Sequence, residues 1–132
     1  ILNEYFLESF EKFHHQMNSF VIGPGLGKIP ILVPIISDVI KIISHSKKPC
    51  VIDADGLWYV SQNPENFAHL GNCVLTPNIV ELKRLGIILG INDVTSATQI
   101  SAKLGNTWIF SKGMSDVITN STIGIFLIML QL

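Results

Sequence analysis

The sequence predicts an α/β domain built on a layered, mostly parallel β-sheet. Short apolar segments alternate with longer segments whose apolar residues recur at helical spacing. The short segments show almost no polar alternation, which is typical of strands buried on both faces of a parallel sheet. Repeated strand–helix–strand units favour right-handed crossovers between parallel strands. The candidate strands are residues 20–22, 50–52, 73–75, 108–110 and 117–119.

Length and composition restrict the chain to one small folded domain. Its 132 residues leave room for a single hydrophobic core. Hydrophobic residues make up 48% and charged residues 14%, a balance that argues against disorder. The net charge is −1 and the basic residues do not cluster, so we expect no nucleic-acid partner. The apolar run at 123–130 is far shorter than the ~20 residues of a membrane span, so we expect no membrane partner.

Helices are predicted between the strands. Apolar residues recur at helical spacing over 35–43, and Pro34 suits the first turn because no N–H is needed there. Asp55 is predicted to cap a short helix after the second strand. A last helix is predicted to begin at Thr95 and to stop at Gly105.

Two alternatives remain for the start of the helix after the third strand. Either Thr76 caps it, or Asn78 caps it and Glu81 completes a capping box. We expect this helix to end near Gly86.

The cysteines and histidines indicate no metal site. Cys50 and Cys73 each begin a strand-like run, and we expect both to be small buried side chains. No CxxC pair or Cys/His cluster is present, so zinc is not supported. His14 and His15 are expected to be exposed, within an amphipathic stretch over 1–20 that is unlike a signal peptide.

The run Gly23-Pro-Gly-Leu-Gly27 follows a strand and precedes a helix. Glycine lets a ligand approach the backbone closely, and a following helix N-terminus favours an anionic group. A tight connection without a ligand explains the same residues. The run fits neither a Rossmann fingerprint nor a Walker A loop.

Two aspartates stand at the end of the second strand. Asp53 and Asp55 can hold a Mg²⁺–phosphate shell or hydrogen-bond a substrate hydroxyl. Capping alone explains Asp55 equally well. Asp53 is the stronger candidate, because a carboxylate at the end of a buried strand costs free energy unless it binds a partner or a ligand.

Two further runs carry polar groups after strands. Asn78 and Glu81 share a helix face. They either cap the helix and form part of its solvent-exposed face, or they present an amide and a carboxylate to a ligand. Lys112 and Gly113 can meet a phosphate, with Asp116 closing a tight turn; a plain hairpin turn explains them equally well.

Together and in this order, these runs resemble the ATP-dependent NAD(P)H-hydrate dehydratase family. The resemblance rests on Val51-Ile-Asp-Ala-Asp-Gly-Leu-Trp58, Leu75-Thr-Pro-Asn-Ile-Val-Glu81 and Lys112-Gly-Met-Ser-Asp116, and it runs from about residue 19 to residue 120. It implies a ribokinase-like fold, truncated here. The asparagine at position 78 is similar to the eukaryotic, ATP-using branch of the family.

The resemblance also implies an activity, the repair of damaged nicotinamide nucleotides. Hydrated NADH or NADPH is phosphorylated on its new hydroxyl by ATP with Mg²⁺, and elimination of that phosphate restores the dinucleotide. The implied enzyme is cytoplasmic or mitochondrial and can be a homo-oligomer. The residues implied to line the hydrated dinucleotide are Gly25, Gly27, Asn78, Ile79, Val80, Glu81, Leu82, Lys83 and Arg84. Those implied to line ATP are Lys112, Gly113, Met114, Ser115 and Asp116.

The family's catalytic run, Gly-Gly-Gln-Gly-Asp, does not occur in this sequence. We therefore assign no catalytic residue. We expect an incomplete dehydratase domain over 1–120 and an apolar tail over 121–132 that does not match the family. Two rival hypotheses remain: another ribokinase-like small-molecule kinase, and an inactive remnant or interaction module.

Overall fold

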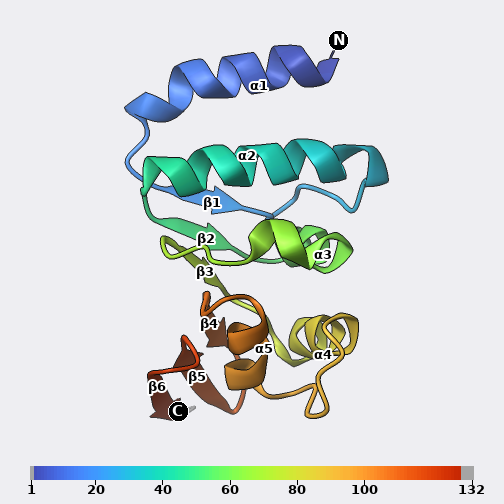
Figure 1. Cartoon of the computed structure of the whole chain (residues 1–132), viewed down its shortest axis with the longest axis vertical. Coiled ribbons are helices and arrows are strands. Elements are labelled where there is room, and N and C mark those ends of the chain that lie inside the picture. The colour runs from blue at the N-terminus through green and yellow to red at the C-terminus, as the bar shows by residue number, and fades with distance from the viewer. Residues whose placement is uncertain (1, 129–132) are drawn as a thin grey trace.

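The computed structural model describes residues 2–128 and shows one six-stranded sheet with helices packed along it (Figure 1). No helix in this part of the chain is both long and apolar enough to cross a membrane. The strands are β1 Phe20–Ile22, β2 Cys50–Ile52, β3 Cys73–Leu75, β4 Trp108–Ser111, β5 Ser115–Thr119 and β6 Gly124–Ile128. The α-helices are α1 Leu2–Phe13, α2 Val33–Ser46, α3 Asp55–Gln62, α4 Ile79–Ile88 and α5 Ala97–Lys103. Short 3-10 helices are η1 His14–Gln16, η2 Pro30–Leu32 and η3 Pro64–Phe67.

The sheet confirms the predicted class and its mostly parallel character. Its strands are ordered β1-β2-β3-β4-β5-β6, and the first four run parallel. β5 and β6 are antiparallel to their neighbours, and β6 was not predicted. The predicted tail at 121–132 therefore contributes a strand as far as Ile128, and residues 129–132 lie outside the described part of the chain.

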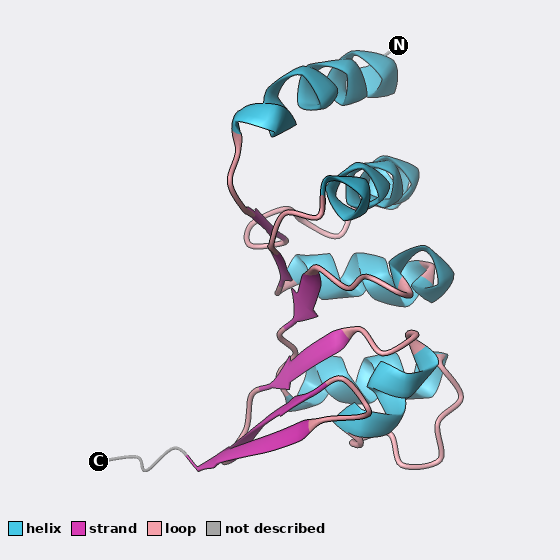
Figure 2. Cartoon of the chain, turned by 60° about the vertical axis from the view of Figure 1, so that its left-hand side comes forward, coloured by secondary structure: helices cyan, strands magenta, loops and turns pink. Residues whose placement is uncertain are grey.

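The helices gather on one face of the sheet (Figure 2). Right-handed crossovers that add each new strand on the same side place every connecting helix on the same face. Cys50 and Ile52 face these helices and are buried, whereas Val51 between them is 37% exposed. Val21, at the centre of β1, is 68% exposed. The expectation that these strands are buried on both faces is therefore wrong for the described residues.

The two cysteines are buried in the core, as predicted, and the sheet places them side by side. Cys50 and Cys73 occupy paired positions on β2 and β3, and both are buried. A hydrogen bond with Cys73, together with burial, raises the pKa of the Cys50 thiol. This thiol therefore stays protonated and packs as a small apolar group. Other fully buried core side chains are Ile40, Ile52, Tyr59, Leu75, Leu82 and Ile109.

The start of α4 settles the alternative left open by the sequence. Asn78 Oδ1 accepts from the N–H groups of Val80 and Glu81, with N···O distances of 2.9 Å each. Glu81 Oε2 accepts from the Asn78 N–H at 2.8 Å. The pair forms a complete capping box, so Asn78 and not Thr76 caps the helix.

Two other predicted helix boundaries need correction. α4 continues past Gly86, where a side chain would collide with the backbone of Val94. The glycine is needed for this close packing and does not end the helix. α5 is capped by the side chain of Ser96 and not by Thr95. Gly105 follows the end of α5 with a φ of +63°, as predicted.

Candidate functional site

The runs singled out in the sequence follow β1, β2, β3 and β4, four neighbouring parallel strands. The carboxyl ends of parallel strands meet at one edge of a sheet, which is where ligands bind in open α/β folds. Three backbone hydrogen bonds tie these ends together. Asp53 N–H donates to Ile22 O, Thr76 N–H to Ile52 O, and Lys112 N–H to Pro77 O.

An ion pair spans this edge. Lys112 Nζ lies 2.9 Å from Asp53 Oδ1, although 59 positions separate the two residues in sequence. Asp53 follows β2 and Lys112 follows β4, so the pair crosses the end of β3 between them. Both side chains are partly exposed, at 33% and 42%. Asp53 is therefore paired with Lys112 within the chain, and its role toward a ligand stays a prediction.

The surroundings of Asp53 favour its charged form. Partial burial acts to raise the pKa of the carboxyl group. Hydrogen bonds from Lys112, the Ala54 N–H and Thr76, with the positive charge of Lys112, outweigh burial and lower the pKa below its usual value. The Ala54 bond is short, with N···Oδ1 2.8 Å. Asp53 is thus a fixed negative charge at neutral pH.

The glycine turn is packed closely against the start of α3. A side chain at Gly23 would overlap the carbonyl oxygen of Asp53 and lie 2.5 Å from the Gly56 nitrogen. Gly23 also has a φ of +126°, which side chains rarely adopt. Gly25 has no heavy atom within 4 Å of the position its side chain would take. Gly23 is therefore structural, and Gly25 faces open space.

Asp55 does not cap α3, contrary to the prediction. The N-cap is Ala54, which makes no side-chain cap hydrogen bond. The Asp55 carboxylate turns instead to the glycine turn, where Oδ2 accepts from the Gly27 N–H at 2.9 Å. The Tyr59 hydroxyl donates to the Gly27 carbonyl at 2.8 Å. Both polar backbone groups of this glycine are thus bonded within the protein.

The predicted dinucleotide residues on α4 divide by exposure. Asn78, Ile79 and Val80 are exposed at the start of the helix, but Leu82 is only 1% exposed and packs in the core. Lys83 is exposed, while Glu81 and Arg84 are half-buried. The side chains that a ligand can contact are therefore those at the start of α4 and the charged or partly exposed side chains that follow, Glu81, Lys83 and Arg84.

The predicted ATP residues form a β-hairpin turn. β4 and β5 pair antiparallel, and Asp116 Oδ1 accepts from the Gly113 N–H at 3.0 Å. Met114 stands at the tip and is 97% exposed, and Ser115 is exposed beside it. The hairpin interpretation of these residues is confirmed, and a ligand role stays a prediction.

The two aspartates are the carboxylates that this edge offers to a Mg²⁺ ion. Across residues 2–128, no three His, Cys, Asp or Glu side chains come together as a metal site. Mg²⁺ often keeps several waters and is held by one or two carboxylates with substrate phosphates. A Mg²⁺ role for Asp53 and Asp55 stays a prediction.

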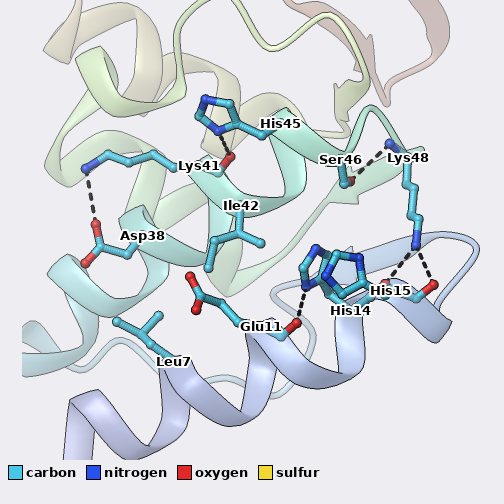
Figure 3. A pocket seen from close by; sticks show the side chains of 10 residues that line it. All are labelled: Leu7, Glu11, His14, His15, Asp38, Lys41, Ile42, His45, Ser46 and Lys48. Atoms are coloured by element: carbon cyan, nitrogen blue, oxygen red, sulfur yellow. Dashed lines mark hydrogen bonds and ion pairs between the residues drawn. The ribbon is translucent and has the colours of Figure 1, made fainter.

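A cavity of about 740 Å³ lies elsewhere, between α1, η1 and the second half of α2 (Figure 3). Its lining includes none of the predicted site residues. Lys48 Nζ donates to the carbonyls of His14 and His15 at 2.8 and 3.0 Å, and Lys41 pairs with Asp38. His14 is buried here, so the prediction of two exposed histidines is correct only for His15. The Lys48 ammonium thus holds η1 against the segment between α2 and β2.

Sequence reasoning missed Tyr59 as a partner of the glycine turn. Its side chain is 0% exposed, and a buried tyrosine hydroxyl needs a hydrogen-bond partner. The spacing of four residues from Asp55 on one helix was an available signal, because such residues share a helix face.

A sequence model of the NAD(P)H-hydrate dehydratase family matches residues 3–130. The chain belongs to this family. The dehydratase match extends past residue 120, and the proposed division of the chain there stays a prediction. The resemblance inferred from the sequence runs is thereby confirmed.

Individual dehydratases align over most of this chain. It is 40% identical to the ATP-dependent (S)-NAD(P)H-hydrate dehydratase of Schizosaccharomyces pombe, covering 80% of this chain and 32% of the relative. The mouse enzyme of the same name is 35% identical, covering 86% and 35%. The human one is 35% identical, covering 83% and 33%. The chain spans about a third of the length of these relatives.

A solved structure shows the same fold. The crystal structure of a ribokinase-like superfamily protein from Enterococcus faecalis aligns with a TM-score of 0.70 at 24% identity. The alignment covers 95% of this chain and 43% of that one. This chain therefore has the ribokinase-like fold that the resemblance implied.

Proposed function

We propose that this chain is the part of an ATP-dependent (S)-NAD(P)H-hydrate dehydratase that holds two ligands at one sheet edge. Hydrated NADH or NADPH contacts the glycine turn and the start of α4, and ATP contacts the hairpin turn after β4. Its relatives carry this enzyme name, and the chain belongs to their family. The observation that carries the proposal is the convergence of these runs at the carboxyl ends of β1 to β4.

The ion pair between Asp53 and Lys112 positions an ammonium group that can donate hydrogen bonds to ATP. A lysine ammonium has three N–H donors, and the bond to Asp53 uses one of them. The partly exposed Lys112 keeps donors for an oxygen of ATP, while Asp53 holds the ammonium in place. Mg²⁺ bound to the phosphates of ATP can be held by Asp53, whose side chain is partly exposed at the same edge. We propose no general base among these residues.

Calorimetric titrations of the 132-residue chain test the proposal. Hydrated NADPH and a non-hydrolysable ATP analogue are titrated separately into the wild type, Lys112→Ala and Lys103→Ala. Lys103 is an exposed lysine in the last turn of α5 and serves as the matched control. We expect Lys112→Ala to weaken the ATP analogue by roughly ten- to a hundredfold, because a charge-assisted contact is worth about 1.5–3 kcal/mol.

Other outcomes contradict specific parts of the proposal. If Lys112→Ala leaves ATP-analogue affinity unchanged and only lowers stability, the hairpin turn is structural and ATP does not bind there. If the wild type binds the ATP analogue and a small-molecule alcohol but not hydrated NADPH, the chain is a different ribokinase-like kinase. If Lys103→Ala matches Lys112→Ala, the effect is one of net charge.

A further inference from the structure

The glycine turn is held at a single residue by two side chains of α3. The Gly27 N–H donates to Asp55 Oδ2 at 2.9 Å, and the Gly27 carbonyl accepts from the Tyr59 hydroxyl at 2.8 Å. The same hydroxyl accepts from the Ile29 N–H at 3.2 Å. Asp55 and Tyr59 lie four residues apart and therefore on one face of the helix. We call these two side chains the Gly27 clamp.

The clamp has little freedom to move away from the turn. Tyr59 is fully buried, so its hydroxyl cannot turn to solvent. Gly23 and Gly56 are in close contact, and a side chain at Gly56 would come within 2.7 Å of the Ile22 carbonyl oxygen. This contact sets the distance between α3 and the turn, and it keeps the Asp55 carboxylate at Gly27.

The position of that carboxylate restricts the ligands that the turn can take. In phosphate-binding turns, free backbone N–H groups and a helix N-terminus point at the anion. Here the Asp55 carboxylate already bonds the Gly27 N–H, and its negative charge repels a second anion at short range. Gly25, with a φ of +71° and no atom within 4 Å of its side-chain position, leaves its backbone open to a ligand.

We propose that the Gly27 clamp makes the glycine turn accept an uncharged, hydroxyl-bearing part of its ligand at Gly25 and reject phosphate. Asp55 and Tyr59 are positioning residues in this scheme, since they act through Gly27. The inference rests on the proposed function, which makes hydrated NAD(P)H the ligand. The uncharged parts of that ligand are its riboses and the hydrated ring, so its pyrophosphate lies away from the turn.

Nuclear magnetic resonance of the ¹⁵N-labelled 132-residue chain tests the ligand preference. Inorganic pyrophosphate and the neutral 1,4-dihydronicotinamide riboside are titrated separately, and the Gly25 and Gly27 amide signals are followed. In the wild type we expect the riboside to shift the Gly25 signal and millimolar pyrophosphate to leave it unchanged. In Asp55→Asn, which keeps an acceptor oxygen and removes the charge, pyrophosphate should shift both signals. Asp38→Asn removes an exposed carboxylate on α2 and should behave as the wild type.

Amide hydrogen exchange at Gly27 tests the clamp without any ligand. Asp55→Ala should speed this exchange roughly tenfold or more, because a hydrogen bond to a charged acceptor is lost. Tyr59→Phe keeps the ring in the core and removes only the hydroxyl, so it tests the clamp even if Asp55→Ala does not fold. Tyr5→Phe removes an exposed hydroxyl from α1 and is its matched control.

The outcomes separate this inference from the proposed function. Unchanged Gly27 exchange in both clamp variants overturns the inference, as does a wild-type Gly25 signal that responds to pyrophosphate. If the riboside shifts no signal of the wild type, the proposed ligand is wrong. In that case the exchange rates and the pyrophosphate response of Asp55→Asn still decide whether Asp55 excludes anions from the turn.

Discussion

Alanine substitutions at two glycines of one turn should have very different costs. Gly23→Ala places a methyl group against backbone atoms, overlapping the Asp53 carbonyl oxygen and lying 2.5 Å from the Gly56 nitrogen. Gly25→Ala places the same group where no atom lies within 4 Å. Both residues have positive φ values, +126° and +71°, so both variants also strain the backbone.

The expected magnitudes follow from these contacts. At Gly25, left-handed strain costs about 1–2 kcal/mol, and the stiffer unfolded chain returns about 0.4–1 kcal/mol. The net loss is then about 1 kcal/mol. At Gly23, strain of about 1–3 kcal/mol joins an overpacking cost of about 1–3 kcal/mol, because the colliding atoms are backbone and cannot rotate aside. After the same return from the stiffer unfolded chain, we expect a loss of about 3 kcal/mol there.

Urea denaturation followed by tryptophan fluorescence measures both losses. The wild type and the two variants are compared at the same protein concentration, with the slope of the transition checked for constancy. A total stability of about 5–15 kcal/mol makes a loss of about 3 kcal/mol easy to detect. If Gly23→Ala comes within about 0.5 kcal/mol of Gly25→Ala, the close contact between the turn and α3 does not exist in solution, since independent surface changes vary by that much.

Two further predictions concern stability. Asn78→Ala removes the capping box and should lower the free energy of unfolding by about 1 kcal/mol, whereas Asn92→Ala, at an exposed position outside any helix, should leave it unchanged. Equal losses in urea titrations of the two variants would contradict the cap. The pKa of Asp53 is lower in the folded protein than in the unfolded chain. The ionised carboxylate therefore stabilises the fold at pH values above its unfolded-chain pKa, and this contribution is lost as the pH falls through its folded-state pKa. Between about pH 5 and pH 2, urea midpoints of the wild type should therefore fall more steeply than those of Asp53→Asn, and parallel curves would refute the ion pair.

The local chemistry of the site could be predicted from sequence because it depends on neighbours in the chain. Asn78 and Glu81 are three residues apart, and this spacing made the capping box one of the two alternatives for the start of α4. The alternation of apolar runs and helical stretches placed the polar residues after strands, and parallel pairing brought them to one edge. Predicting the ion pair between Asp53 and Lys112 would also have required the order of β2, β3 and β4 in the sheet, which the sequence does not state.

What could not be predicted depends on contacts between distant segments. The spacing rule that suggests a cap at Asp55 holds only if the side chain has no better donor nearby, and the folded turn supplies one in the Gly27 N–H. Apolar runs predict burial without saying which face is covered, so the exposure of Val21 had no sequence signal. Gly86 looks like a helix end until Val94 is known to pack against it.

The order of the strands in the sheet is also their order in the chain. Each strand therefore pairs with the one that precedes it, and no strand must be inserted between two others that have already formed. During synthesis on the ribosome, β2 can pair with β1 once α2 and β2 have emerged, and each later strand can join the growing edge in turn. Each parallel pair is joined by a crossover that contains at least one helix, and pairing strands in chain order closes smaller loops than pairing them out of order would. A sheet with this topology is assembled in the direction in which it is translated.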